Sequence, residues 1–397
     1  MTSASVAPVF ELGINYWPRR RAMEMWRDFA LAEIVDEFAH IASMGFDTVR
    51  VMAMTRDFLT GPSSVSGTMV DRLVQVARAA ADAGLGVVPT LVVINMSGRI
   101  WWPAWMLDAS GAPGDLFADP VVLQAQSLLA TRCAQALAGG ANLRAIDLAN
   151  EIDDAQRPAS RDAGRLWTSV LAEAIRNAAP GVPVQVGAHL PSLTTVNHMR
   201  VDDIAAVADE DMMHTYPLYS ASARHFLDPE LVPFSCALTS ALAARGRRTL
   251  MQEFGLCTAP TGSGGLSITD DFLGTPRAQY LASEEEGAEY YDAVLTRLVS
   301  TGAAGAYAWC YADYDARLWD RPPLDTAVRE RTFGLVRADG TEKPAVGVFR
   351  ALRARRDGGG VALGDVPPVL DVSADDYYAA PGTQFHRLYA RWLESRA

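Results

Sequence analysis

The chain has little that would cross-link it or hold it in a membrane. Its 397 residues include only four cysteines, which lie far apart and form no CxxC pair, so we expect reduced, buried thiols. No apolar run is long enough to span a bilayer, and the first residues lack a basic segment followed by an apolar stretch. We therefore expect a cytoplasmic protein without disulfides and without a membrane partner.

Positive charge and metal-binding patterns are also scarce. The formal net charge is -12, which disfavours nucleic acid as a partner. The six histidines are scattered without ligand spacing, so no metal site is predicted. No glycine-rich, phosphate-binding pattern is present, and we expect no nucleotide and no other cofactor. With these partner classes disfavoured, we expect a small neutral or cationic molecule as the partner. The sequence does not decide whether the protein forms a homo-oligomer.

The chain is rich in apolar runs that alternate with amphipathic, helix-like segments. The runs predict eight strands, at 10–17, 48–53, 86–93, 143–150, 182–188, 212–216, 248–254 and 304–311. Eight strands with helices between them predict an α/β protein, a closed (β/α)₈ TIM barrel. We place the barrel at 1–356 and expect 357–397 to be a short C-terminal extension packed on it, because it is too short for an independent domain.

Three of the connections that follow strands are unusually long, after the first, third and seventh strands. Long connections in a compact domain are usually functional or disordered. All three would lie at the C-terminal face of the barrel, where barrel enzymes build their sites. The sequence therefore predicts a site at this face.

Two glutamates end predicted strands, Glu151 in "AIDLANEID" and Glu253 in "LMQEFG". Burying a carboxylate at a strand end is costly unless something compensates. Barrel closure brings both strand ends to one rim, and two carboxylates across a pit suit glycoside hydrolysis. For either glutamate alone, an ordinary ion pair with an arginine would explain the position equally well.

Other polar and aromatic residues are predicted to converge on the same rim. At the strand ends these are Arg50, Asn150, His214, Tyr216 and Trp309. Further candidates follow the first and third strands: Asn15, Trp17, Asn95, Trp101 and Trp102. Hydrogen-bond donors beside aromatic rings are what a sugar needs, because the C–H faces of pyranosides stack on aromatics.

Together, "ANE" at the fourth strand and "QEFG" at the seventh resemble clan A of the glycoside hydrolases, most closely family 5. The resemblance implies that Glu151 is the general acid/base and Glu253 the nucleophile of a retaining double displacement. It implies that the charge of Glu253 raises the pKa of Glu151. It also implies a non-proline cis peptide bond between Trp309 and Cys310.

The same resemblance assigns roles to the neighbours. Asn150 is expected to bind the sugar 2-hydroxyl, and Arg50 and Tyr216 to hold the nucleophile. His214 is expected in the site wall and Trp309 under the non-reducing sugar. One departure is that the family's usual histidine after the third strand is absent, with Asn95 the nearest polar residue.

Within the family, the segments "GINYWP", "MWRDF" and "RTFGLVRADGTEKPA" are similar to the branch containing exo-acting β-mannosidases. We therefore expect a retaining exo-β-glycosidase, a β-mannosidase acting on short oligosaccharides. An endo-β-1,4-mannanase or β-glucanase is the alternative enzyme. A carbohydrate-binding barrel without activity is the alternative of another class.

Overall fold

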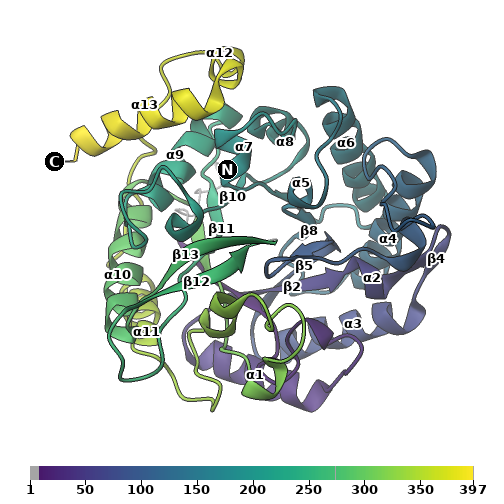
Figure 1. Cartoon of the computed structure of the whole chain (residues 1–397), viewed down its shortest axis with the longest axis horizontal. Coiled ribbons are helices and arrows are strands. Elements are labelled where there is room, and N and C mark those ends of the chain that lie inside the picture. Colours follow the sequence, from purple (N-terminus) through teal and green to yellow (C-terminus); the bar gives the residue numbers. More distant parts are fainter. Residues whose placement is uncertain (1–8, 273, 397) are drawn as a thin grey trace, which may run out of the picture.

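The computed structural model describes residues 9–272 and 274–396, and its centre is a barrel of parallel strands (Figure 1). The strand order is β10-β11-β14-β1-β2-β5-β8-β9, and the backbone N–H of His214 donates to the Ala188 carbonyl at 2.8 Å, which closes the ring between β9 and β10. The predicted TIM barrel and its eight strands are confirmed. They are β1 (Glu11–Tyr16), β2 (Thr48–Met54), β5 (Gly86–Val93), β8 (Ile146–Asn150), β9 (Val184–Gly187), β10 (Met212–His214), β11 (Leu250–Phe254) and β14 (Gly305–Ala308).

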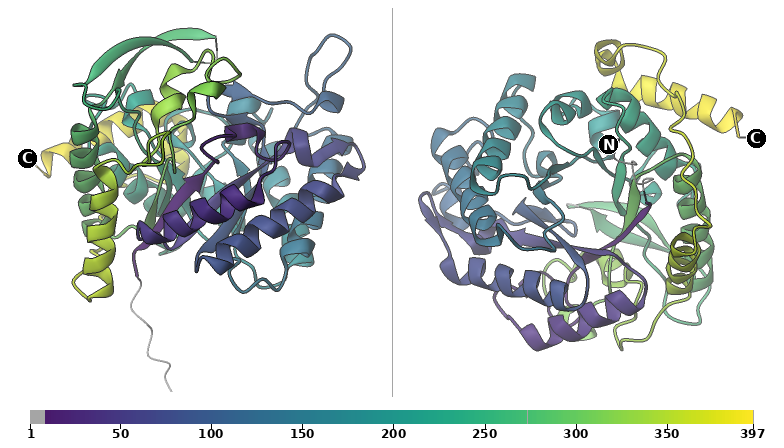
Figure 2. Two further views of the ribbon diagram at one scale, coloured as in Figure 1. Left: turned by 90° about the horizontal axis from the view of Figure 1, so that it is seen from below. Right: turned by 180° about the vertical axis from the view of Figure 1, so that it is seen from behind.

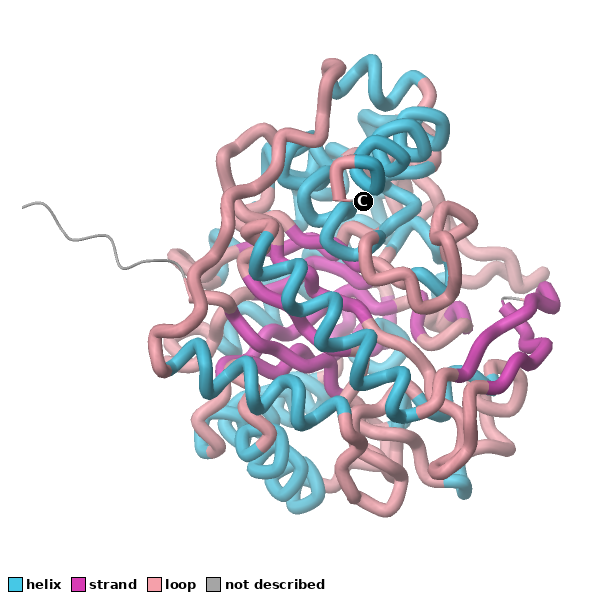
Figure 3. Tube along the Cα trace, turned by 90° about the vertical axis from the view of Figure 1, so that its left-hand side faces the viewer, coloured by secondary structure: helices cyan, strands magenta, loops and turns pink. Residues whose placement is uncertain are grey.

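A helix follows each barrel strand, and Figure 3 shows helices covering the outside of the barrel on the side that faces the viewer. A capping box begins α10 (Glu284–Ser300): the Ser283 hydroxyl accepts from the backbone N–H of Glu286, and the Glu286 carboxylate accepts from the backbone N–H of Ser283. The outer helices are α1 (Leu31–Ser43), α3 (Gly67–Asp82), α4 (Pro120–Leu137), α6 (Arg161–Ala178), α8 (Val201–Val207), α9 (Leu231–Ala243), α10 (Glu284–Ser300) and α11 (Ala345–Asp357).

The connections at the C-terminal face contain structure of their own. Short helices there are α2 (Thr55–Phe58), α5 (Ile152–Ala155) and α7 (Leu190–Thr194). Small hairpins pair β3 (Leu59–Gly61) with β4 (Ser64–Val65) and β6 (Asn95–Met96) with β7 (Arg99–Ile100). The 3₁₀ turns are η1 (Ala22–Glu24), η2 (Ala104–Met106), η3 (Pro217–Tyr219), η4 (Ala316–Leu318) and η5 (Val328–Thr332).

The connection after the seventh barrel strand, which the sequence presented as a loop, is a long hairpin of β12 (Leu266–Phe272) and β13 (Thr275–Leu281). It lies across the mouth of the barrel in Figure 1. The first four residues of β13 are exposed, so no apolar alternation marks the strand in the sequence. Gly274, at φ +83°, occupies the turn.

A fourth long connection, 309–344, also folds over the mouth and holds the hairpin in place. Asp270 on β12 accepts hydrogen bonds from the backbone N–H groups of Val328 (2.8 Å) and Arg329 (3.0 Å). It also accepts from the Arg329 guanidinium at 2.9 Å, and both charged side chains are fully buried. We call the β12–β13 hairpin and η5 together the cover.

The C-terminal residues include two helices, α12 (Ala374–Ala379) and α13 (Pro381–Glu394), on the outside of the barrel (Figure 2). The Tyr377 hydroxyl donates to the Leu193 carbonyl of α7 at 2.6 Å. The Phe385 and Tyr389 rings lie 5.1 and 5.0 Å from the Phe234 ring of α9. Within residues 9–272 and 274–396, no helix is both long and apolar enough to cross a membrane.

Candidate active site

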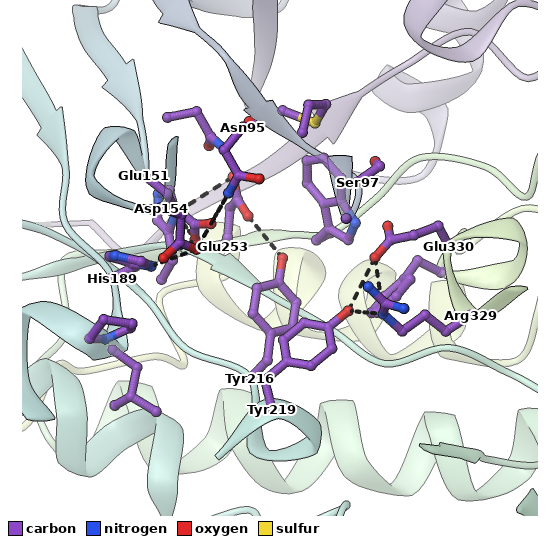
Figure 4. A pocket seen from close by; sticks show the side chains of 18 of the residues that line it. Asn95, Ser97, Glu151, Asp154, His189, Tyr216, Tyr219, Glu253, Arg329 and Glu330 are labelled. Carbon is purple, nitrogen blue, oxygen red and sulfur yellow. Dashed lines mark hydrogen bonds and ion pairs between the residues drawn. The ribbon is translucent and has the colours of Figure 1, made fainter. Parts of the chain in front are cut away.

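A pocket of about 380 Å³ opens where the barrel strands end, beneath the cover. Figure 4 shows Glu253 and Tyr216 near its middle, with Glu151, Asp154 and His189 on one side and Arg329 and Glu330 on the other. The lining also includes seven of the residues predicted from the sequence: Asn95, Asn150, Glu151, His214, Tyr216, Glu253 and Trp309. The two predicted carboxylates, Glu151 and Glu253, therefore both line the pocket and have distinct surroundings.

Glu253 is the more deeply buried of the two carboxylates, with an exposed fraction of 4%. One carboxylate oxygen pairs with the Arg50 guanidinium, and the other accepts from the Tyr216 hydroxyl at 2.9 Å. Burial and the charge of Glu253 raise the pKa of Tyr216, so the phenol remains a donor. These two donors compensate the burial of the carboxylate and fix its orientation.

Arg50 lies under the pocket floor and is fully buried. Its guanidinium donates to Asp147 (2.8 Å), to the Asn150 side-chain oxygen (3.0 Å) and to the Asn15 side-chain oxygen (3.0 Å). Asn15 in turn donates to the Gln252 carbonyl at 3.0 Å. The predicted residues Arg50 and Asn15 thus hold the site from below, and neither belongs to the pocket lining.

Glu151 directly follows β8 and has φ +43°, a left-handed conformation that is uncommon for a residue other than glycine. Its carboxylate lies 2.9 Å from Nδ1 of His214 and 3.8 Å from Nδ1 of His189. One oxygen each of Glu151 and Glu253, together with a His214 ring nitrogen, lie within 4.8 Å of one another. The two carboxylates therefore face the same small volume.

The pKa of Glu151 differs from the prediction. Burial raises its pKa, but the neighbouring His189 and His214 rings outweigh burial and hold the pKa below its usual range. The pKa of His189 is raised to about 10, because Asp153, Asp154 and Glu151 outweigh its desolvation. The pKa of His214 is raised as well, by Glu253 and Glu151 against burial. The sequence offered no sign that two histidines with raised pKa values lie beside Glu151.

The spacing of Glu151, His214 and Glu253 would by itself suit a metal ion. Each of the three already has protein partners, however, since both ring nitrogens of His214 lie 2.9 Å from a side-chain oxygen and Glu253 is paired with Arg50. The group therefore fits an acid–base network better than a cation site.

Three predicted tryptophans lie outside the pocket lining. Trp17 is fully buried in the core. Trp101 lies between two guanidiniums, 4.0 Å from Arg56 and 4.9 Å from Arg99, and its indole N–H donates to Met96. Trp102 is half-buried and packs against the core. The rings of these three tryptophans pack against other parts of the protein, so their positions are explained without a bound sugar.

Several residues that line the pocket were not predicted from the sequence. At one end these are Asp154 and His189, and at the other Tyr219, Arg329 and Glu330. Asp154 stands three residues after Glu151, which could have signalled it. Glu330 directly precedes the "RTFG" segment that carried the resemblance, but nothing in the sequence showed that 309–344 folds over the mouth.

The non-proline cis peptide bond predicted between Trp309 and Cys310 is present. Trp309 lines the pocket, with its side chain almost fully buried.

No family model and no curated protein matches the chain, whereas solved structures do. A GH5_18 protein from Streptomyces cattleya, in complex with GlcNAc, matches over 97% of this chain and 92% of its own, with 22% identity and a TM-score of 0.80. A GH5_18 variant from Bifidobacterium longum, in complex with Manβ1-4GlcNAc, matches over 89% and 80%, with 18% identity and a TM-score of 0.75.

An exo-β-1,4-mannosidase from Opitutaceae bacterium strain TAV5 is 26% identical, with a TM-score of 0.75. The match covers 91% of this chain and 62% of the mannosidase. The fold of this chain is similar to the folds of these GH5_18 structures and of the exo-β-1,4-mannosidase. This confirms the predicted resemblance to family 5 glycoside hydrolases, near exo-acting mannosidases.

Proposed function

We propose that the protein is a retaining exo-β-glycosidase that removes terminal β-mannosyl residues from short oligosaccharides. The observation that carries the proposal is the approach of the Glu151 and Glu253 carboxylate oxygens to within 4.8 Å. Retaining enzymes separate their two carboxyl groups by about 5–5.5 Å, whereas inverting enzymes need about 6.5–9.5 Å to admit a water molecule.

The surroundings of each carboxylate suit one role. Glu253, held by Arg50 and Tyr216, attacks the anomeric carbon and forms a covalent glycosyl-enzyme as the glycosidic bond breaks. Glu151 gives a proton to the leaving oxygen, then takes one from the water that releases the sugar. Its carboxylate contacts His214, so the two groups hold that proton together.

The shape of the site favours exo action. The cover closes the mouth beside Tyr219 and Glu330, so the sugar bonded to Glu253 would end against side chains. A polymer would need an open path in both directions. The neighbours crystallised with Manβ1-4GlcNAc and the exo-β-1,4-mannosidase support a terminal β-mannosyl residue as the sugar. A cytoplasmic location, a homo-oligomer and the division at residue 356 stay predictions.

Hydrolysis of a panel of p-nitrophenyl glycosides tests this function. We expect the β-mannoside to be cleaved faster than the β-glucoside, β-galactoside and β-xyloside, with the β-anomer of mannose released first. Rapid loss of viscosity of a mannan solution would instead establish the endo alternative. Oligosaccharide binding without any hydrolysis would establish the carbohydrate-binding barrel.

A further inference from the structure

A chain of side-chain hydrogen bonds runs through the barrel from the site to the opposite end. Nε2 of His214 lies 2.9 Å from the Gln252 side-chain oxygen. The Gln252 amide nitrogen donates to the Gln185 side-chain oxygen at 2.8 Å, and the Gln185 amide nitrogen donates to Glu210 at 2.5 Å. Both glutamines are fully buried, whereas Glu210 is half-buried before β10 and pairs with Arg144 at 2.7 Å.

The direction of this chain is set by the carboxylate at its end. An ionised carboxylate only accepts hydrogen bonds, so the Gln185 amide nitrogen must face Glu210 and its oxygen must face Gln252. The Gln252 nitrogen then faces Gln185, and its oxygen faces His214. Nε2 of His214 must therefore carry a hydrogen, because it faces the Gln252 side-chain oxygen.

This assignment decides what Nδ1 of His214 can do for Glu151. In the neutral ring Nδ1 is bare and accepts from a protonated Glu151; in the charged ring Nδ1–H donates to the carboxylate. Both forms hold one proton between the ring and Glu151. The opposite neutral tautomer would have its hydrogen on Nδ1 and could not accept from the acid.

Given the proposed function, we propose that Glu210, Gln185 and Gln252 are positioning residues that fix the protonation pattern of His214 and keep a shared proton available to Glu151. The charged groups facing the pair are fixed by the structure. Glu253 and Arg50 face His214, and His189, Asp153 and Asp154 face Glu151. The row of hydrogen bonds from Glu210 holds the neutral Gln252 side-chain oxygen against Nε2 as an acceptor. The His214 ring can therefore carry a proton on Nε2 without a further charged group beside that nitrogen.

The experiment compares Gln185→Met with wild type over a range of pH. Without Gln185 the Gln252 amide can turn and present its NH₂ group to Nε2. The alkaline limb of kcat/KM for a β-mannosyl disaccharide should move down by about one pH unit, with about a tenfold loss at the alkaline end. Cleavage of dinitrophenyl β-mannoside should change little, because that leaving group needs no proton.

Two matched variants separate positioning from packing. Gln185→Glu combined with Glu210→Gln keeps an acceptor for Gln252 and the same net charge, so it should restore the wild-type alkaline limb. Gln126→Met removes another fully buried glutamine, which accepts from Trp167 in the α4–α6 interface, and should leave the pH profile unchanged. Equal losses for both substrates in Gln185→Met, with no shift of the limb, would overturn the proposal.

Nitrogen NMR of ¹⁵N-histidine-labelled protein tests the chain without using activity. The wild-type ring of His214 should keep its hydrogen on Nε2 when it becomes neutral, and Gln185→Met should populate the Nδ1–H tautomer. Should Gln185→Met fail to fold, Gln252→Glu replaces it, and its carboxylate should move the His214 titration to higher pH. A neutral wild-type His214 ring with its hydrogen on Nδ1 would refute the proposed role of Glu210, Gln185 and Gln252. The expected hydrogen on Nε2 in a protein without glycosidase activity would refute only the proposed function.

Discussion

At the scale of single residues, the alanine variants of Glu151 and Glu253 should react differently with an added anion such as azide. Glu253 is the proposed nucleophile, so Glu253→Ala should lose hydrolysis of every β-glycoside by several orders of magnitude and form an α-product with azide. Glu151→Ala should still react with dinitrophenyl β-mannoside, and azide should speed its second step and give a β-product. Product configuration by proton NMR decides the assignment, and the opposite pair of products would reverse it.

Glu330 is a second residue whose role can be tested. Its carboxyl group lines the pocket on the side away from Glu151 and accepts from the Tyr219 hydroxyl at 3.1 Å. Burial raises its pKa. A carboxyl group there can accept from sugar hydroxyls remote from the anomeric carbon, where a longer chain would have to continue.

We expect Glu330→Gln to lower kcat/KM for the β-mannoside by about 10–100-fold, which corresponds to one or two hydrogen bonds to a charged group. The measurement compares mannoside with its 4-deoxy analogue. The loss should be smaller for the analogue, which lacks one donor, while Glu289→Gln, on the outer helix α10, serves as the control. The same loss for both sugars would contradict a direct contact.

At the scale of elements, a buried ion pair joins the two parts of the cover, the β12–β13 hairpin and η5. Asp270→Asn keeps the size of the side chain but removes the carboxylate that pairs with the buried Arg329 at 2.9 Å, and Glu330 at 3.5 Å remains as a neighbouring negative charge, so the cost should lie below the about 3–5 kcal/mol of a buried charge left unpaired. Because the pair joins the hairpin to η5 and not to the barrel strands, we expect the cost to appear as local opening of the hairpin. We expect faster proteolysis within 257–282 and a raised KM, with little change in the thermal midpoint of the barrel. A lower midpoint with unchanged proteolysis would contradict this separation.

The elements also show what the sequence could predict. The eight barrel strands were predictable because each is an apolar run buried on both faces, as the fully buried β2 and β11 illustrate. The β12–β13 hairpin was not, since its exposed strand lacks apolar alternation. The proposed catalytic pair was predictable from strand ends, and His189 directly follows the predicted strand 182–188 in the same way. Glu330 was not predictable, because it reaches the pocket through a connection whose path depends on tertiary contacts such as the Asp270–Arg329 pair.

At the scale of the whole molecule, buried charges in the site couple global stability to pH. His189 is buried, its Nε2 lies 2.9 Å from Asp153, and its pKa of about 10 exceeds the value near 6.5 expected in the unfolded chain. A raised pKa means that the folded state binds the proton more tightly. The stabilisation is complete below about pH 6.5 and is lost as pH rises through about 10.

We therefore expect the free energy of unfolding of wild type to fall between about pH 7 and pH 10. In His189→Gln this fall should be shallower, because a glutamine can still hydrogen-bond Asp153 but takes up no proton. Asp153 acts at the other end: its pKa is lowered, so its contribution is present above about pH 4 and is lost as pH falls below its folded value. Urea unfolding at a series of pH values measures both limbs. Parallel alkaline limbs in the two proteins would show that His189 does not hold its proton in the folded state, and would remove the second imidazolium from the surroundings of Glu151.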